Sequence, residues 1–382
     1  MFGKKDRIIS IKIGEKYIKF ILVEKKNNQK IIKDNLNIEI DPEVLDTNEK
    51  IYAKIKEVIK ENGWGKIKKN LLYDSPSVVI RDLEVPIIPK NELRPVIERE
   101  VEDIYGDISD KKLVYEIIGE VQKGSSKVYQ LFFALLDKSD IDEIEKQKFN
   151  LKSIDLGIFA DNRIFSNSIS KEKNTLILDM TREKTTVYIY RGKHLKIYRE
   201  LNIGGEVIDI KISNSLNISK EEAEEVKIEY GFVDQKRARE LMNTGQKIGI
   251  PLNMVYQDIT EQWNRKIETS IEYFKSNNQG EGVDKFYITG KVSDLKGIKE
   301  FLRDKWEIEI EDFLADNLFE DETSDENKID FKRNIAPLGA TMLHEPIIDL
   351  KEEEDEEKNR YKLKYIISVI IAMIILFVGY KK

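Results

Sequence analysis

The hydrophobic pattern of this chain passes through the same series of elements twice, and this constrains the fold more than any other feature. The first series opens with two strand-like runs, IISIKI and YIKFILV, on either side of Gly14. The second begins at Thr175 with LILDM, TTVYIY and LKIYREL. Segments with helical spacing and further strands follow each opening. The pattern predicts two similar α/β lobes, a duplication of architecture without obvious sequence repetition.

The charge balance and the lack of cysteine exclude several classes of function. The chain has 64 Lys and Arg against 71 Asp and Glu, a net charge of −7, and six of the acids form the run 352–357. The remainder carries −7 + 6 = −1, so we expect no nucleic-acid surface. Without cysteine there are no disulfides or cysteine zinc sites. The two histidines, His194 and His344, are too few for a histidine metal cage.

Residues 365–380 form an uncharged apolar run, YIISVIIAMIILFVGY. As a helix it would be about 24 Å long, close to the roughly 30 Å hydrocarbon core of a bilayer. Arg360, Lys362 and Lys364 precede it, which by the positive-inside rule places that side in the cytoplasm. The run predicts a single-pass protein of the cell membrane with its main body in the cytoplasm. A buried core helix is the alternative.

Seven motifs follow one another along the chain. They are SVVIRDLEVPIIPKNELRPVIEREVEDIY, LKSIDLGIFADNR, LILDMTREKTTVYIYRGKHLKIYRELNIGGEVID, SKEEAEEVK, SIEYF, FYITGKVSDLKGIKEFL and NIAPLGATML. None is highly specific alone. In this order they resemble the type IV pilus assembly protein PilM, which is itself similar to the cell-division protein FtsA. Both belong to the actin-like ATPase superfold.

The resemblance implies a two-lobed actin-like ATPase fold, an α/β fold with ribonuclease H-like lobes, an inserted α+β subdomain and one C-terminal transmembrane helix. The predicted domains are 1–76 with 150–170 for the first lobe, 77–149 for the inserted subdomain, 171–345 for the second lobe, 346–364 for a PilN-like peptide and charged linker, and 365–380 for the membrane span.

The resemblance also implies a nucleotide site between the lobes, for ATP with Mg²⁺. The positions that match it are Gly14, Lys19, Asp179, Gly204, Gly205, Glu224, Lys227 and Gly290. Two positions before Gly14, where the family carries a metal-binding aspartate, this chain has Lys12. Thr181 and Lys291 stand where glycines are usual. These departures disfavour a MgATP complex.

Two interpretations of the cleft stay open. In the first, Lys12 replaces Mg²⁺ as the counter-charge of a phosphate group. In the second, the cleft is a degenerate remnant that holds no nucleotide. The second is favoured because several positions differ together. No catalytic residues and no metal ligands are therefore assigned, and hydrolysis is not expected.

A second resemblance lies near the C-terminus. The segment Pro346, Ile347, Ile348, Asp349, Leu350 is similar to the start of PilN, the partner whose cytoplasmic peptide PilM-type proteins bind. The resemblance implies that a partner peptide and its groove lie on one chain, the groove being between the first lobe and residues 77–149. A chance apolar patch ahead of an acidic linker is the alternative.

Together these features predict a membrane-tethered actin-like scaffold of the type IV pilus inner-membrane platform, coupling it to cytoplasmic assembly components. The implied partners are PilN/PilO-like membrane proteins and pilus motor ATPases, with self-association left open. Two alternatives remain. One is an FtsA-like cell-division adaptor, and the other is an active ATPase or kinase of the same superfold. Lys12 in the place of the expected aspartate argues against the second.

Overall fold

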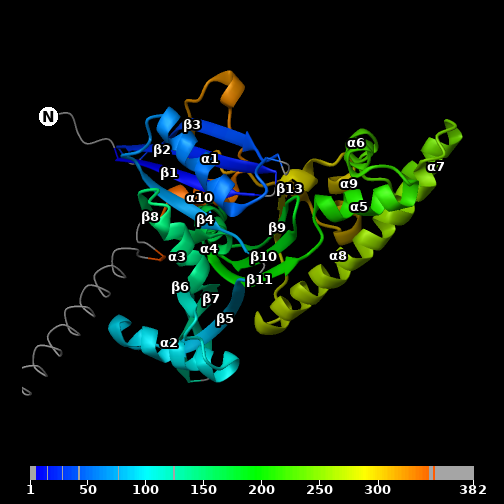
Figure 1. Cartoon of the computed structure of the whole chain (residues 1–382). Coiled ribbons are helices and arrows are strands. Elements are labelled where there is room, and N and C mark those ends of the chain that lie inside the picture. The colour runs from blue at the N-terminus through cyan, green and yellow to red at the C-terminus, as the bar shows by residue number, and fades with distance from the viewer. Residues whose placement is uncertain are drawn as a thin grey trace, which may run out of the picture.

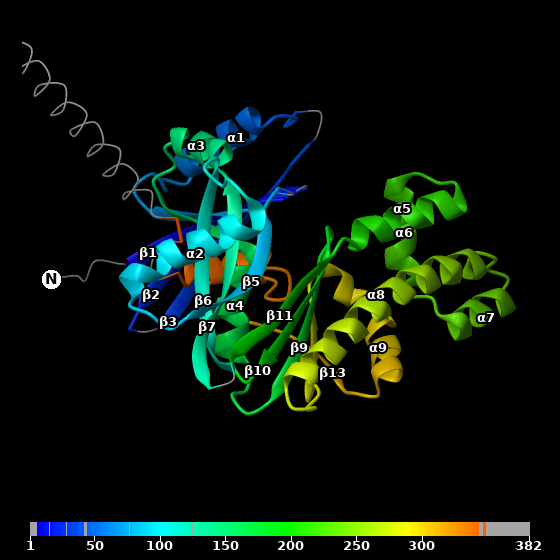
Figure 2. The same cartoon turned by 90° about the horizontal axis from the view of Figure 1, so that it is seen from below.

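The computed structural model describes residues 6–343, apart from 15, 28, 42–43, 76 and 124, together with residues 347–348. Three sheets organise this part of the chain, one in each of two lobes and one in a smaller subdomain beside the first lobe (Figure 1). Viewed from below, the subdomain and the helices of the second lobe lie at opposite sides of the molecule (Figure 2). The predicted architecture of two α/β lobes is confirmed.

The first lobe is built on a six-stranded sheet with the order β14-β3-β2-β1-β4-β8. Its strands are β1 (Asp6–Ile13), β2 (Tyr17–Lys26), β3 (Gln29–Glu39), β4 (Lys68–Tyr73), β8 (Leu151–Leu156) and β14 (Glu320–Asp321). The first three are antiparallel neighbours, whereas β4 and β8 continue the sheet in parallel. The strands β3 and β4 are parallel and lie on either side of β2 and β1, and α1 (Asn48–Glu61) makes the crossover connection that parallel strands need.

Two helices of this lobe lie against each other, α4 (Gly157–Ser168) and α10 (Ile335–Thr341). Their backbones approach so closely that a Cβ at Gly339 would fall 1.9 Å from the carbonyl oxygen of Ala160. Only glycine permits such an approach. The chain therefore returns from the second lobe to the first through β14 and α10, a crossing that hydrophobic periodicity does not reveal.

The inserted subdomain has a three-stranded antiparallel sheet with the order β5-β7-β6. Its elements are β5 (Val79–Pro86), α2 (Lys90–Tyr105), β6 (Lys111–Lys123), β7 (Ser126–Asp137) and α3 (Lys138–Lys146). Leu93, Ile97 and Val101 of α2 recur at every fourth position and are buried in the small core of this subdomain. This spacing is the helical period expected for one buried face.

The second lobe has a five-stranded sheet with the order β11-β10-β9-β12-β13. The strands are β9 (Asn174–Met180), β10 (Thr185–Arg191), β11 (His194–Leu201), β12 (Lys285–Thr289) and β13 (Ile310–Asp312). The helices are α5 (Gly205–Leu216), α6 (Lys220–Tyr230), α7 (Gln235–Asn243), α8 (Gly249–Asn277) and α9 (Ile298–Trp306), with the 3₁₀ turn η1 (Lys291–Asp294). A second 3₁₀ turn, η2 (Asp325–Asn327), lies against β3 of the first lobe. Ser219 and Glu222 form a capping box that fixes the start of α6.

The lobes share an apolar core where they meet. Phe165 of α4 lies 5.0 Å from Tyr188 of β10 and 4.8 Å from Phe313, measured between ring centroids, both edge to face. All three rings are buried in the same cluster as the core of the first lobe. Such contacts add to the energy of burial and fix the two sheets around the cleft described below.

The membrane localisation predicted from the sequence is corrected here. Within the part of the chain that the structure describes, no helix is both long and apolar enough to cross a bilayer. The longest helix there, α8, has 29 residues but carries charged side chains along its length. The assignment as a single-pass protein of the cell membrane, with a transmembrane helix, is therefore not supported. The segment 365–380, on which it rested, lies outside the described residues.

Candidate functional site

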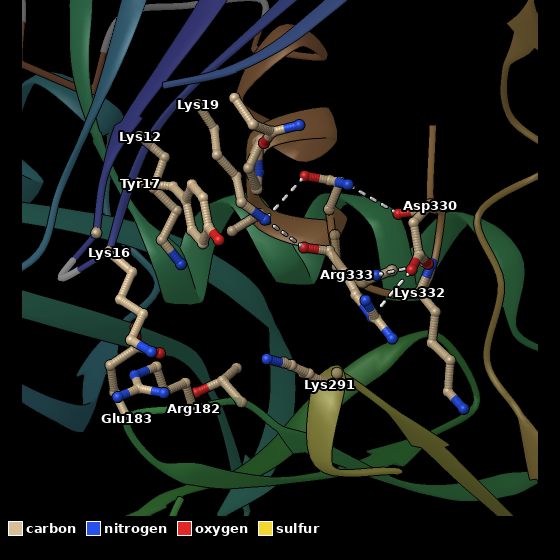
Figure 3. A pocket seen from close by; sticks show the side chains of 18 of the residues that line it. Lys12, Lys16, Tyr17, Lys19, Arg182, Glu183, Lys291, Asp330, Lys332 and Arg333 are labelled. Atoms are coloured by element: carbon tan, nitrogen blue, oxygen red, sulfur yellow. Dashed lines mark hydrogen bonds and ion pairs between the residues drawn. The ribbon is translucent and has the colours of Figure 1, made fainter. Parts of the chain in front are cut away.

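A cleft of about 450 Å³ lies between the two lobes. Its walls come from the β1–β2 turn, the β9–β10 turn, α6, η1 and the segment that leads into α10 (Figure 3). Eight of its lining side chains are Lys or Arg and four are Asp or Glu, an excess of 8 − 4 = 4 positive charges. The volume falls in the range typical of small-molecule sites. The cleft is thus suited to an anionic ligand.

Two lysines lie side by side on the first-lobe wall. Lys12 of β1 and Lys19 of β2 are direct cross-strand partners, so their side chains extend from the same face of the sheet. Lys19 Nζ donates hydrogen bonds to the carbonyl oxygen of Arg333 and to Asn334 Oδ1, both at 3.2 Å (Figure 3). Burial and the charge of Lys12 lower the pKa of Lys19 to about 8.

Asp179, next to the last residue of β9, lies at the floor of the cleft and interacts electrostatically with a buried acid, Asp161. Burial raises its pKa to about 6, although the charges of Lys12 and Lys184 act in the opposite direction. Asp161 of α4 accepts a 2.6 Å hydrogen bond from the Tyr188 hydroxyl. Burial and the charge of Asp179 raise the pKa of Asp161 to about 7. Lys12 and Lys19 thus lie near two carboxyl groups, Asp161 and Asp179, whose pKa values are raised.

The structure places Gly290 where a side chain would collide with the floor of the cleft. Its backbone has φ 82° and ψ 167°, a region that essentially only glycine occupies. A Cβ there would lie 2.5 Å from the carbonyl oxygen of Met180 and 2.7 Å from Asp179 Oδ1. The glycine therefore lets η1 approach the end of β9.

We expect Gly290→Ala to lower the free energy of unfolding by about 2–3 kcal/mol, because the variant must accept backbone strain and move the end of β9. Denaturant unfolding of the full chain measures this change. Gly65→Ala is the matched control, since a Cβ at Gly65 meets nothing within 4 Å. Equal losses in the two variants would contradict the close approach of Gly290 to β9.

Glu224 joins the two lobes across the mouth of the cleft. Its carboxylate accepts hydrogen bonds from Lys16 of the first lobe at 2.9 Å and from Lys291 of η1 at 2.8 Å. Arg182 Nη1 is 3.4 Å from the same carboxylate. Burial alone would raise the pKa of Glu224, but Lys291 and Lys16 lower it to about 2. The residue predicted to contact a nucleoside is thus held by three cations.

Lys227 is also engaged within the protein. Its ammonium forms an ion pair with the buried Asp209 of α5 and donates to the carbonyl oxygen of Gly205 at 3.3 Å. Burial lowers the pKa of Lys227 and raises that of Asp209. Gly204 allows its backbone to pack closely against that of Arg182, because a Cβ there would lie 2.2 Å from the carbonyl oxygen of Arg182. These positions stabilise the second lobe beside the cleft.

The structure brings together some of the residues that sequence reasoning predicted for a cofactor site. Five of the eight predicted cofactor positions line the cleft, namely Gly14, Lys19, Asp179, Glu224 and Gly290. Sequence reasoning missed Asp161, Arg182, Lys332 and Arg333. The last two stand directly before the NIAPLG motif, and Asp161 directly follows the apolar stretch GIFA. A charged residue next to a motif or an apolar stretch was the sequence signal that could have identified these positions.

The residues present do not fit Mg²⁺. Among the described residues, no group of three or more Asp, Glu, His or Cys side chains could hold a metal ion. On β1, where a carboxylate would be needed, the side chain is that of Lys12. The arrangement can hold phosphate oxygens by charge, and it offers no carboxylate cage for a metal.

A second feature lies at the open edge of the first-lobe sheet. Ile348 pairs with Ile154 of the edge strand β8 through an antiparallel bridge. The Ile347 N–H donates to Ser153 Oγ at 3.0 Å. Ile348 is 1% exposed and belongs to the first-lobe core, and Ile347 packs against that core. Of the predicted partner peptide, Pro346, Asp349 and Leu350 lie outside the described residues.

Comparison with known proteins agrees with this architecture. The family "Cell division protein FtsA" matches residues 176–326. Cell division proteins FtsA from two Helicobacter pylori strains, 26695 and J99, are 23% identical over 214 residues, which covers 51% of this chain and 42% of each relative. The chain thus spans about two fifths of these curated relatives.

Among solved structures, a PilM-PilN type IV pilus biogenesis complex superimposes with a TM-score of 0.69 at 17% identity, covering 88% of this chain and 97% of the other. At this identity the likeness shows the fold. The predicted resemblance to PilM and FtsA is confirmed to that extent, and the chain has a PilM-like, actin-like ATPase fold. The predicted PilN-like tail is not confirmed.

Proposed function

We propose that this chain is a PilM-like scaffold that acts by holding a short, extended apolar peptide on the edge of β8. The observation that carries the proposal is the antiparallel bridge between Ile348 and Ile154, next to the hydrogen bond from Ile347 to Ser153. The chain itself supplies the peptide in this structure. A PilN-like partner with the same pattern would use the same edge.

The physical basis is the addition of a strand to an open sheet edge. An edge strand presents unpaired N–H and C=O groups, which an extended peptide can pair while pockets select its side chains. Ile348 fills such a pocket, since it is 1% exposed. Full burial of an isoleucine contributes about 1.5–3 kcal/mol. A contact that consists of one backbone bridge and one buried side chain is small enough for a short peptide to bind and dissociate.

The partner class follows from the fold. The structure with a TM-score of 0.69 is a complex of PilM with PilN, which supports a PilN-like protein as the source of the peptide and residues 346–350 as its counterpart in this chain. In this proposal the chain couples a pilus assembly platform to cytoplasmic components such as motor ATPases. The excess of cations among the residues that line the cleft supports a role in binding.

Competition between the chain's own segment and a free peptide tests the proposal. The probe is a fluorescent peptide, HEPIIDLK, which reproduces residues 344–351. In the wild-type chain the linked segment competes at an effective concentration of order millimolar. Ile348→Asp removes this competitor, so the peptide should bind the full-length variant at least about tenfold more tightly than it binds wild type. Fluorescence anisotropy measures both affinities.

Two further variants sharpen the result. Ile104→Asp makes the same substitution at an exposed isoleucine of α2 and should bind the peptide as wild type does. Ser153→Ala in the Ile348→Asp background should weaken binding about two- to tenfold, because one hydrogen bond is lost. A folded Ile348→Asp variant, checked by circular dichroism, that binds the peptide no better than wild type would refute the β8 site.

A second candidate is an FtsA-like role in cell division, which the family match to residues 176–326 favours. Deletion of the gene separates the two functions. Loss of pili with normal division would support the pilus scaffold, whereas filamentous cells with normal pili would support the division adaptor.

A further inference from the structure

The cleft between the lobes carries a pair of cations that the fold leaves without carboxylate partners. Of its eight cationic side chains, five form ion pairs with carboxylates, namely Lys16, Arg182 and Lys291 with Glu224, and Lys332 and Arg333 with Asp294. A sixth, Lys328, is exposed and donates a hydrogen bond to the carbonyl oxygen of Asp321 at 3.1 Å. Lys12 forms no hydrogen bond or ion pair with any described residue, and Lys19 bonds only to carbonyl oxygens. Both side chains are half-buried.

This arrangement costs the protein stability as it stands. Lys12 and Lys19 are directly opposite each other on adjacent strands, where like charges repel. The repulsion and burial together lower the pKa of Lys19 to about 8. An anion placed between the two ammonium groups would relieve both effects. Figure 3 shows the side chains of Lys12, Lys19 and Lys291 directed toward the space between the lobes.

We propose that the cleft binds a phosphate-chain anion without a divalent metal, with the Lys12 ammonium as the cation that faces the phosphates. The cleft has room for more than one phosphate, at about 450 Å³, and its cations come from both lobes. An anion with several charged groups can contact them together. Because lysine is a compact point charge with three donors, Lys12 can contact the ligand and still act electrostatically on Asp161 and Asp179, whose pKa values it lowers.

The alternative is that Lys12 acts only within the protein. Its charge opposes the raised pKa values of Asp161 and Asp179, so it could simply be the counter-ion of these two acids. In that case the lysine would influence stability and leave anion binding unchanged. A binding measurement separates the two roles.

Isothermal titration calorimetry on the full chain, with inorganic tripolyphosphate as the probe and EDTA in the buffer, tests the proposal. We expect binding in EDTA, and weaker binding with excess Mg²⁺, because the metal neutralises the phosphate oxygens that the lysines would contact. Lys12→Met keeps the apolar stem and should weaken binding by about tenfold or more, the loss of one charge-assisted contact. Lys26→Met, at the exposed far end of β2, should bind as wild type does.

Several results would overturn the proposal. They are no heat of binding in EDTA, binding only when Mg²⁺ is present, or unchanged affinity in a folded Lys12→Met variant. If Lys12→Met does not fold, Lys19→Met takes its place with the same expectation. ATP is run in parallel. Equal affinity for ATP and tripolyphosphate supports recognition of the phosphate chain, whereas binding of ATP alone would show that the nucleoside is recognised and would contradict it.

Discussion

Lys227→Met should lower the free energy of unfolding by about 3 kcal/mol, because it leaves the buried Asp209 without its principal counter-charge. Asp209 is 0% exposed and Lys227 is 6% exposed, so water cannot replace the lost partner. Arg182 Nη1 lies 3.9 Å from Asp209 and partly offsets its charge. The expected loss of stability is therefore at the lower end of the roughly 3–5 kcal/mol found when one partner of a buried ion pair is removed. Chemical denaturation of the full chain at neutral pH measures the change.

A double variant distinguishes an ion pair from simple packing. Asp209→Asn combined with Lys227→Met removes both charges and should recover most of the stability that Lys227→Met loses. Lys236→Met, at an exposed position of α7, should change stability by less than about 0.5 kcal/mol. If the double variant is no more stable than Lys227→Met alone, the two charges are not a coupled pair.

The buried acid Asp161 should make the stability of the protein fall as the pH rises. A carboxyl whose pKa is raised on folding keeps its proton where the unfolded chain has lost it, so unfolding releases a proton in that window. For Asp161 the window runs from the ordinary aspartate pKa of 3.8 to about 7. Below it the group is neutral in both states, and its full contribution is present.

Asp161→Asn should remove this decrease in stability at higher pH. The amide oxygen can still accept the hydrogen bond from Tyr188, and the neutral side chain feels neither Asp179 nor the cations Lys12 and Lys184. Compared with wild type, the variant should gain up to about 3–4 kcal/mol between pH 4 and pH 8.

Denaturant unfolding at the two pH values gives this difference directly. Any constant cost of the new amide, whose nitrogen replaces an oxygen that lacks a hydrogen-bond partner, is the same at both pH values and cancels. Asp325→Asn, at an exposed position of η2, is the control. A pH dependence in Asp161→Asn equal to that of wild type would show that Asp161 is ionised in the folded protein at neutral pH.

The sequence was a good guide to the elements and a poor guide to their contacts. The paired strands around Gly14 and the strands that begin near Thr175 appear as predicted, because short apolar runs bounded by turn residues form strands that are buried on both faces. In contrast, the helix predicted to touch a nucleoside presents Glu224 and Lys227 to other charges. Their partners, Lys16, Lys291 and Asp209, are 18 to 208 residues away in the sequence, and a local pattern cannot predict such contacts.

The sequence by itself determined the two-lobed α/β architecture, the glycine turns and the presence of Lys12 where a metal carboxylate was expected. These are local properties, since strand period, turn chemistry and residue type are fixed by neighbours in the chain. Only the tertiary structure decided that Lys12 and Lys19 stand beside buried acids, that Glu224 bridges the lobes, and that Ile348 pairs with β8. Each depends on segments brought together by the burial of a shared core, and charge and hydrogen-bond energies depend on those distances.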